Sequence, residues 1–304
     1  MASLPISVIH LDDQFLVGPA LDLTLYAADL TQPEFDALFG LYQALCPDDR
    51  RTWWKVAEDF FYQPYREGGR EASLNSPAME RYRYRVANGW RAEFRVWDGR
   101  AEETWSFACY RLPRTADLPP AAFYRFLLPA TADPAILRRA AETVVGSVPL
   151  LSGHGGYTLL YDGSRLSTAF NRIYPLARRY WGLDVEHLNS TMRLMRGGIK
   201  GVSWLTLIGP KFLEKLGGPA AIGPLEEADT PVSIAQGGAL VTSGTTPTWL
   251  DQNRPGPETG RYQRVARALE ALFLPDFPDL PGRFTAEGNS SGWFRRFLQP
   301  RGWR

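Results

Sequence analysis

Apolar and polar residues alternate along several stretches of the chain, and this alternation predicts β-strands with one buried face. The alternation is clear at residues 21–27, and residues 123–128 and 156–161 are also expected to form strands. In other stretches apolar residues return every three or four positions, which predicts amphipathic helices. These helices are expected at residues 33–45, 52–61, 133–145, 167–180, 210–216 and 261–273. Strands and helices therefore share the chain along most of its length.

Residues 80–112 show the most regular alternation and predict a three-stranded antiparallel meander. The dipeptides Asn88-Gly89 and Asp98-Gly99 separate the alternating runs, and such dipeptides favour the tight turns of β-hairpins. One face of this meander would carry aromatic and aliphatic side chains and would be buried. The opposite face would carry Arg81, Arg83, Arg85, Arg91 and Arg95.

The stretch from residue 180 to residue 218 contains an apolar run at 202–208, which lies between Gly201 and Gly209. We predict that this run forms a central strand of the fold and feeds the helix that follows it. No His, Cys or paired carboxylate lies within the run or beside it. We therefore expect the whole stretch to be structural and poor in titratable groups.

These elements predict an α+β fold in which antiparallel sheets, built from the meander and hairpins, are covered by amphipathic helices. A second hairpin is expected at residues 231–243, around Gln236-Gly237-Gly238. A Pro-rich stretch suggests two related lobes. The predicted division is an N-terminal α+β lobe with the meander (1–112), a C-terminal α+β lobe (121–274) and a Pro- and Gly-rich tail with an aromatic and basic end (275–304). The tail either packs on the domain or is mobile.

The composition is that of an ordinary folded protein that is rich in aromatic residues. Its 304 residues are 44% hydrophobic and 22% charged, and they include ten Trp. The formal net charge of +1 gives no general attraction to nucleic acid or to anionic membranes. The N-terminal residues lack the basic and apolar regions of a secretory signal, and no apolar run is long enough to span a membrane. We therefore expect a cytoplasmic protein that does not bind membranes.

Metal binding and cofactor binding find little support in the spacing of reactive residues. The candidate metal ligands are His10, His154, His187, Cys46 and Cys109. None of them lies within four residues of another, whereas structural zinc sites commonly have two ligands close in sequence. We expect no metal and no cofactor, and we interpret the two cysteines as buried free thiols.

Two short motifs resemble catalytic or phosphate-binding loops. Residues 288–292 fit the G-x-S-x-G pattern of a nucleophile elbow, but no buried strand precedes Ser290 and no His follows it. Residues 153–156 are rich in glycine but precede a strand, whereas a phosphate-binding loop opens a helix. We interpret the serine motif as a loop or helix cap and the glycines as a sharp turn into the strand at Tyr157. We expect no catalytic residue.

Four segments in the second half of the chain resemble those of a known family. They read GYTLLYD (156–162), RYWGLD (179–184), IKGVSWLTLIG with LGG (199–218) and DQNR (251–254). These segments resemble the type VI secretion system immunity protein family, and the likeness extends over residues 21–274. The scaffold residues of this resemblance are Trp181, Gly182, Asp184, Lys200, Gly201, Trp204, Gly217, Gly218, Asp251, Asn253 and Arg254.

The resemblance implies a protein that protects a bacterium from a type VI secretion effector. Several such effectors are nucleases of the restriction-endonuclease-like kind, so the implied partner is a nuclease toxin in the cytoplasm. The resemblance carries no catalytic residue to this chain. It implies a non-enzymatic protein that works by surface contact.

Surface charges supply the candidate binding positions. An inhibitor of a nucleic-acid-binding toxin is expected to expose acidic residues, because complementary charge speeds association and excludes wrong partners. The candidates for toxin binding are Glu226, Glu227, Asp229, Asp12, Asp13, Asp48 and Asp49. A solvated loop is the alternative interpretation of each acidic cluster.

The arginine face of the predicted meander offers further interpretations. The partner-face candidates are Arg83, Arg85, Arg91 and Arg95. Their guanidinium groups could pair with phosphates while neighbouring aromatic rings stack on bases, which would make the protein a nucleic-acid binder. The same face could instead form ion pairs with a protein partner or be solvated. A hydrolase is a further alternative, although no carboxylate or base-and-nucleophile set has a recognisable spacing.

Overall fold

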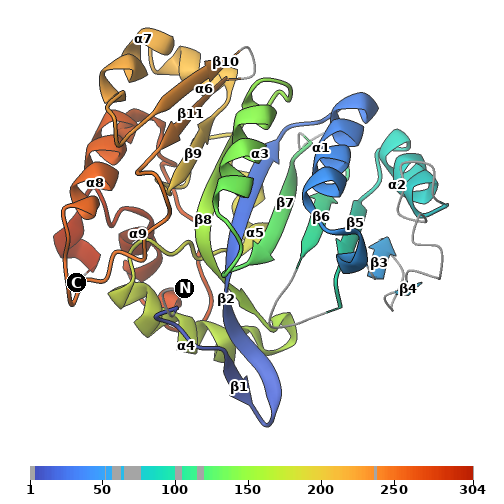
Figure 1. Cartoon of the computed structure of the whole chain (residues 1–304), viewed down its shortest axis with the longest axis horizontal. Helices are drawn as coiled ribbons and strands as arrows, with labels where there is room; N and C mark the ends of the chain where they lie inside the picture. Colours follow the sequence, from blue (N-terminus) through green and yellow to red (C-terminus); the bar gives the residue numbers. More distant parts are fainter. Residues whose placement is uncertain are drawn as a thin grey trace.

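The computed structural model describes residues 4–51, 53–56, 63–64, 77–99, 105–114, 120–235 and 238–303. The strands in these residues form one antiparallel sheet (Figure 1). They are β1 (Ile9–Leu11), β2 (Gln14–Ala27), β3 (Trp53–Val56), β4 (Gln63–Pro64), β5 (Ala92–Trp97), β6 (Ser106–Arg111), β7 (Ala122–Pro129), β8 (Ser152–Tyr161), β9 (Leu205–Ile208), β10 (Val232–Ala235) and β11 (Gly238–Thr242). Their order is β10-β11-β9-β8-β2-β7-β6-β5-β3-β4, and β1 pairs with β2.

The α-helices connect and cover these strands. They are α1 (Gln32–Leu45), α2 (Pro77–Ala87), α3 (Ala135–Val145), α4 (Leu166–Arg179), α5 (Leu188–Leu194), α6 (Pro210–Lys215), α7 (Pro219–Ile222), α8 (Glu258–Ala268) and α9 (Asn289–Phe294). Short 3-10 helices lie at Asp48–Arg50, Gly163–Arg165, Gly223–Leu225, Glu270–Leu272, Gly282–Thr285 and Pro300–Trp303. The predicted α+β class, with antiparallel sheet covered by amphipathic helices, is confirmed.

Strand β2 is the centre of the sheet. It pairs with β7 on one side and with β8 on the other, and almost all of its residues are buried. The prediction that the apolar run at 202–208 forms the central strand is wrong. Its strand β9 begins at Leu205 and lies between β8 and β11, toward one edge. An apolar run indicates that a segment is buried. It does not show whether the whole run is a central strand or whether part of it is a buried connection before a shorter strand.

One face of the sheet is apolar and lies beneath helices α1 and α3, which run side by side across it (Figure 1). Along β2 this face carries Leu21, Leu23 and Leu25, all fully buried. Helix α1 contributes Phe35 and Phe39, which pack on aromatic rings of β5, β6 and β7. The spacing of four residues places both rings on the same side of the helix.

The other face of the sheet is polar at its centre. Because side chains alternate along a strand, Asp22, Thr24 and Tyr26 of β2 point away from α1 and α3. All three are nevertheless fully buried. The segment that covers them leads from residue 184 through α5 to Lys200. The sheet is therefore covered on both faces at its centre, and polar groups must find partners inside the protein.

Residues Pro77–Ala87 form helix α2, so the prediction of a strand at the start of the meander is wrong. Met79 and Tyr82 are buried and Val86 packs against the core, which is the spacing of one helical face. The alternation of Arg and Tyr also fits a strand, so periodicity alone did not separate the two structures. As a result Tyr84, which was expected on the buried face, is 62% exposed. The two later strands of the meander are confirmed as β5 and β6.

The prediction of a helix at residues 52–61 is wrong for residues 53–56. These residues form β3, which pairs with β5. Tryptophan and valine favour strands over helices, and they outweigh the helical spacing of this stretch. Residue 52 and residues 57–61 lie outside the described residues. The loop predicted at residues 63–77 includes β4 at its start, where Gln63 and Pro64 pair with β3.

The glycines at residues 153–156 lie inside β8 and do not form the predicted turn. A Cβ atom on Gly153 would lie 2.9 Å from the carbonyl oxygen of Thr24, and one on Gly155 would lie 2.9 Å from that of Asp22. Glycine at these two positions therefore allows β8 to pack closely against β2. Because the motif lies inside a strand and does not open a helix, it lacks the geometry of a phosphate-binding loop.

Strands from the two predicted lobes are interleaved in the sheet, since β2 lies between β7 and β8. The division into lobes stays a prediction. The C-terminal residues 275–303 pack on the body of the protein, where Trp293, Phe297 and Trp303 are buried. The indole N–H of Trp303 donates to the carbonyl oxygen of Ala177 in α4, at 3.4 Å. Of the two expectations for the tail, packing is confirmed.

We predict that Trp303→Ala lowers the free energy of unfolding by about 3 to 5 kcal/mol, as large-to-small core substitutions do. Trp303 is 2% exposed, and its ring packs on Phe284, Tyr174 and Trp293. Urea denaturation measures the change. Trp90→Ala is the matched control, because Trp90 is 48% exposed and its loss should cost less than about 1 kcal/mol. Equal losses of stability in both variants would show that the tail does not contribute to the hydrophobic core.

Candidate functional site

Five titratable residues form a buried charge cluster on the polar face of the sheet. They are Asp22 of β2, His154 of β8, and Asp184, Glu186 and Lys200 from the covering segment. Each is at most 4% exposed. The strand register places His154 directly opposite Thr24 on β2, so the imidazole lies on the same face as the Asp22 carboxylate. Three distant parts of the chain therefore meet at this cluster.

Lys200 makes the strongest contacts in the buried charge cluster. Its ammonium group donates to both carboxylate oxygens of Asp184, at 2.8 and 2.7 Å, and forms an ion pair with Glu186. The Nε2 atom of His154 lies 2.6 Å from Asp184 Oδ2 and 2.9 Å from Glu186 Oε1. The hydroxyl of Tyr26 donates to both oxygens of Glu186, at 3.3 Å each.

Two arginines complete the surroundings of the cluster. Nη2 of Arg125 on β7 lies 3.1 Å from Asp22 Oδ2 and 3.4 Å from the hydroxyl of Thr158. Arg296 donates to the carbonyl oxygens of Trp181 and Leu183, at 2.8 and 3.0 Å, and so fixes the chain just before Asp184. The formal charges of the carboxylates and the basic groups balance. The carboxylates are Asp22, Asp184 and Glu186, and the basic residues are Lys200, Arg125 and Arg296.

Burial and neighbouring charge set the protonation of the cluster. Burial lowers the pKa of His154, so its imidazole is neutral at pH 7. Burial alone would raise the pKa of Asp184, but His154 and Lys200 outweigh it and hold that pKa well below its usual range. Burial lowers the pKa of Lys200 to about 8, against the attraction of Asp184. At neutral pH the cluster therefore contains an ionised Asp184, a protonated Lys200 and a neutral imidazole.

The donor atoms of Asp22, His154 and Asp184 lie within 4.8 Å of one another, close enough to hold a metal ion. The geometry favours a different role. The ammonium group of Lys200 contacts Asp184 and Glu186 in the manner of a bound cation, and the cluster is already neutral. A further divalent ion would leave uncompensated positive charge in the interior. The arrangement fits a structural charge cluster in which a lysine takes the place of the metal.

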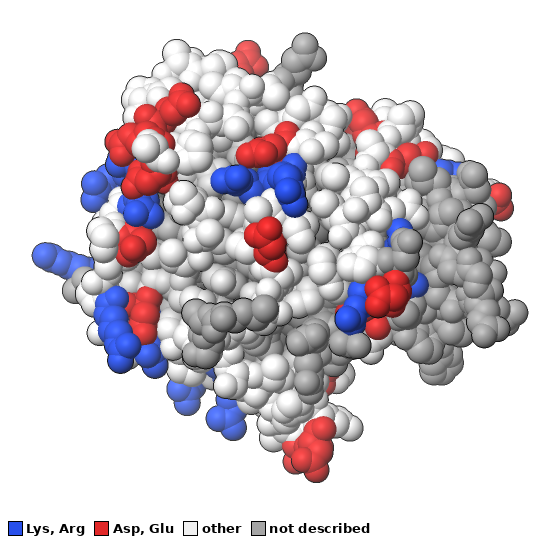
Figure 2. Space-filling model, in the orientation of Figure 1, with Lys and Arg blue, Asp and Glu red and all other residues white. Residues whose placement is uncertain are grey.

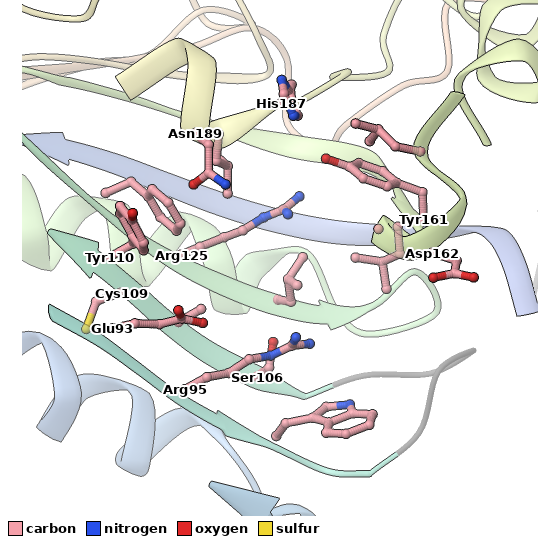
Figure 3. Close-up of a pocket in the computed structure, with 18 of the residues that line it drawn as sticks. Glu93, Arg95, Ser106, Cys109, Tyr110, Arg125, Tyr161, Asp162, His187 and Asn189 are labelled. Carbon is pink, nitrogen blue, oxygen red and sulfur yellow. The ribbon is translucent and has the colours of Figure 1, made fainter. Parts of the chain in front are cut away.

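A groove of about 650 Å³ lies on the same face of the sheet, beside the buried charge cluster. Strands β5, β6 and β7 form its floor (Figure 3). His187 and Asn189 border the groove on the side of α5, and Tyr161 and Asp162 border it at the end of β8 (Figure 3). Burial lowers the pKa of His187. The volume of the groove exceeds those of four other cavities in the described residues, which are about 570, 550, 390 and 210 Å³.

Two arginines face each other across the floor of the groove. The register pairs Arg95 of β5 with Ala108 of β6, and Ala108 with Arg125 of β7. Neighbouring strands are about 4.8 Å apart, so the two arginine backbones are about 10 Å apart with a small side chain between them. Arg125 also contacts Asp22, and its side chain is 11% exposed. It therefore links the groove to the buried charge cluster.

The partner-face candidates lie on two different elements. Arg91 and Arg95 point outward around β5 with Glu93 between them, and Arg91 lies 3.9 Å from the carboxylate of Glu93. Arg83 and Arg85 lie on α2 instead. Arg83 pairs with Asp36 of α1 at 3.2 Å, and Nε of Arg85 donates to the carbonyl oxygen of Arg91 at 2.7 Å.

The acidic candidates are mostly paired with arginines of the same chain. Asp229 lies 2.5 Å from Arg261, and Glu227 lies 2.7 Å from Arg264. Glu226 is exposed beside them. On the face in view, acidic and basic side chains lie in small mixed groups, one of them near α8 at the left (Figure 2). Pairing reduces the charge that this loop presents to a partner.

The remaining acidic candidates lie at turns. Asp12 and Asp13 form the turn between β1 and β2, both with positive φ, and Asp12 lies 3.8 Å from Arg165. Asp49 lies 3.6 Å from Arg50, within the 3-10 helix that also contains Asp48.

The scaffold residues named from the resemblance occupy structural positions. The tryptophans at 181 and 204 are buried, and the indole N–H of Trp204 donates to the carbonyl oxygen of Gly244 at 2.9 Å. Asp251 accepts two hydrogen bonds from Arg179 and one from the backbone of Asn253, and the Arg254 backbone bonds to the Asp251 carbonyl, which together stabilise a turn. Gly201, Gly217 and Gly218 have positive φ, which favours glycine. A Cβ atom on Gly182 would clash with the carbonyl oxygen of Thr248.

Ser290 of the G-x-S-x-G motif is buried in a loop-stabilising role. Its hydroxyl accepts from the backbone N–H of Leu280 at 2.9 Å and donates to the carbonyl oxygen of Phe284 at 3.0 Å. Among the described residues, no His forms a hydrogen bond with this hydroxyl. The motif lacks the geometry of a nucleophile elbow.

A family model described as type VI immunity for VRR-NUC (TsiV) matches residues 125–297, more than half of the chain. The chain belongs to this family. A solved structure of a Pseudomonas aeruginosa T6SS protein, PA0821, has the same fold, with a TM-score of 0.77 at 19% identity. That likeness covers 96% of this chain and 86% of the other. No curated protein matches the sequence.

The matched range contains most of the buried charge cluster but not Asp22. Among the described residues, no helix of this immunity-family chain is both long enough and apolar enough to cross a membrane.

The expectation that residues 180–218 lack titratable groups is wrong, since the segment supplies Asp184, Glu186 and Lys200 to the cluster. Asp184 and Lys200 were named as separate scaffold residues, and the structure pairs them. His154 was weighed as a metal ligand by sequence spacing, which cannot reveal a partner 30 residues away. Asp22 is the one signal in the sequence that pointed to this cluster, and sequence reasoning missed it. An acidic residue on the second face of a strand needs polar partners if that face is also covered.

We predict that Lys200→Met lowers the free energy of unfolding by about 3 to 5 kcal/mol, because it leaves Asp184 and Glu186 buried without their cation. Chemical denaturation at pH 7 measures the loss. Lys211→Met on the exposed surface of α6 is the matched control and should change stability by less than about 0.5 kcal/mol. A loss below about 1 kcal/mol for Lys200→Met would refute the role assigned to the cluster.

We also predict that the protein loses stability as the pH falls below about 6.5, the usual pKa of histidine. His154 has a lowered pKa in the native state and takes up its proton on unfolding, so its contribution is present above that pH and decreases below it. The lowered pKa of Asp184 extends the loss toward lower pH. Denaturation midpoints between pH 8 and pH 4 measure the effect. Replacing His154 by Asn should reduce this dependence.

Proposed function

We propose that this chain is an immunity protein that binds a VRR-NUC nuclease effector of the type VI secretion system and neutralises it. The match of the family model over residues 125–297 carries this proposal. The encounter would take place in the cytoplasm, where a nuclease reaches its nucleic acid substrate. The partner is therefore a protein toxin, and the chain needs no cofactor for this role.

Occlusion is the mechanism that the described residues support best. The acidic and basic side chains of the buried charge cluster are enclosed in a neutral set, where no substrate reaches them. The Ser290 hydroxyl is engaged by backbone groups in the same way. What the chain offers a partner is surface, and a stable inhibitory complex buries about 1,600 Å². Such a contact would cover the active site or the substrate groove of the nuclease.

Co-expression tests the proposal. A VRR-NUC effector, which we expect to be the product of the neighbouring gene, should stop the growth of a bacterial host when expressed alone, and co-expression of this chain should restore growth. The two proteins should purify together and elute as one complex in gel filtration. The Trp303→Ala variant serves as a control for loss of folded protein, and an unrelated immunity protein serves as a control for specificity. Toxicity that persists beside folded immunity protein would refute the proposal.

A further inference from the structure

Three arginines lie against aromatic rings along β5 and its approach. The guanidinium carbon of Arg85 lies 5.7 Å from the ring centre of Trp90. The corresponding distances are 4.8 Å for Arg91 and Tyr110, and 5.3 Å for Arg95 and Trp97. These distances are typical of cation–π contacts. We call this set of three pairs the arginine–aromatic ladder.

The ladder is accessible to a partner at its outer end. Trp90 is 48% exposed and meets the ring of Tyr84, which is 62% exposed, edge to face at 5.7 Å. Among the described residues, the other large apolar side chain with a comparable exposure is Ile234, at the far edge of the sheet and 48% exposed. The side chain of Arg91 is 57% exposed. Contiguous exposed apolar groups rimmed by polar residues mark interaction sites, and these two rings lie together beside the ladder arginines.

At its inner end the ladder enters the groove. Arg91, Arg95, Trp97 and Tyr110 all line it, and Arg125 lies across its floor. Aromatic and arginine side chains are the residues that contribute most to binding at protein interfaces. Stacking against a ring restrains each guanidinium group, so less conformational entropy is lost when it binds a partner. The ladder and groove together form one continuous surface.

The charge of this surface favours an acidic partner. The ladder contributes the three guanidinium groups of Arg85, Arg91 and Arg95, and the groove adds Arg125. The acidic residues among those that line the groove are Glu93 and Asp162. Planar guanidinium groups bind carboxylates in a two-pronged geometry. A segment with several carboxylates therefore fits this surface.

The same composition could suggest single-stranded nucleic acid, but the geometry disfavours it. Proteins that bind single strands leave aromatic faces open so that bases can stack on them. Here one face of each ladder ring is covered by an arginine of the same chain. An acidic protein segment needs no open ring face and is the better fit.

We propose that the arginine–aromatic ladder and the adjoining groove bind a carboxylate-rich segment of the nuclease effector. This inference rests on the proposed immunity function and names the surface that performs it. A nuclease that uses metal ions holds them with clustered carboxylates, so its active site presents acidic chemistry to an inhibitor. Arginines that bind such a segment would exclude the nucleic acid substrate.

Charge reversal tests the inference. Arg91→Glu with Arg95→Glu reverses two members of the ladder, and Arg139→Glu with Arg267→Glu reverses two exposed arginines on α3 and α8 as the matched control. Both variants are first checked for an unchanged thermal unfolding midpoint. Affinity for the purified nuclease, inactivated so that it can be handled, is then measured by calorimetry at two salt concentrations. A fluorescent single-stranded DNA of about 20 nucleotides is titrated in parallel.

We expect the ladder variant to bind the nuclease at least about 100-fold more weakly and the control about 3-fold more weakly or less. The salt dependence of binding should also decrease in the ladder variant. Unchanged affinity in the ladder variant would overturn this inference and leave the immunity function standing. Failure of the unmodified protein to bind the nuclease would overturn both. DNA binding by the unmodified protein that the ladder variant loses would assign the surface to nucleic acid.

Discussion

The ion pair between Lys200 and Asp184 determines how this sheet can be covered on both faces. Strand β2 carries leucines toward α1 and α3 and polar side chains toward the opposite side. A buried carboxylate such as Asp22 is costly unless a positive charge or hydrogen bonds compensate it. The segment that ends at Lys200 covers this face and supplies the compensating charge. The second layer of the fold thus depends on a balanced set of charges as much as on apolar contact.

The same charge balance has a consequence for the surface. Arg125 contacts the buried Asp22 and also lines the open groove. Its position is fixed by a partner that is fully buried, so this part of the groove is held by the core of the sheet. Arg95 lies opposite on the same row of the floor and is restrained by Trp97. Because these side chains are already restrained, little conformational entropy is lost when the groove binds a partner.

Sequence periodicity predicted the elements that have one apolar side, such as α1 and α3, because burial of one face produces a repeat that can be read directly. It failed at α2, where alternating Arg and Tyr fit both structures until the packing of Met79 and Tyr82 decided between them. The cluster was not predictable in the same way. Residues 22, 154 and 200 come together only through strand pairing and the path of the covering segment, which no local pattern records.

The location of the ladder relative to the family match bears on how such a protein selects its toxin. The matched range, 125–297, contains Asp184 and Lys200 and therefore most of the cluster that supports the second layer. Residues 85–97 lie outside it. A scaffold shared with the family and an arginine–aromatic ladder outside the matched range are the arrangement expected if one fold serves different effectors. Charged and aromatic contacts then discriminate between partners, because a mismatched charge in such an interface costs more than a matched one gains.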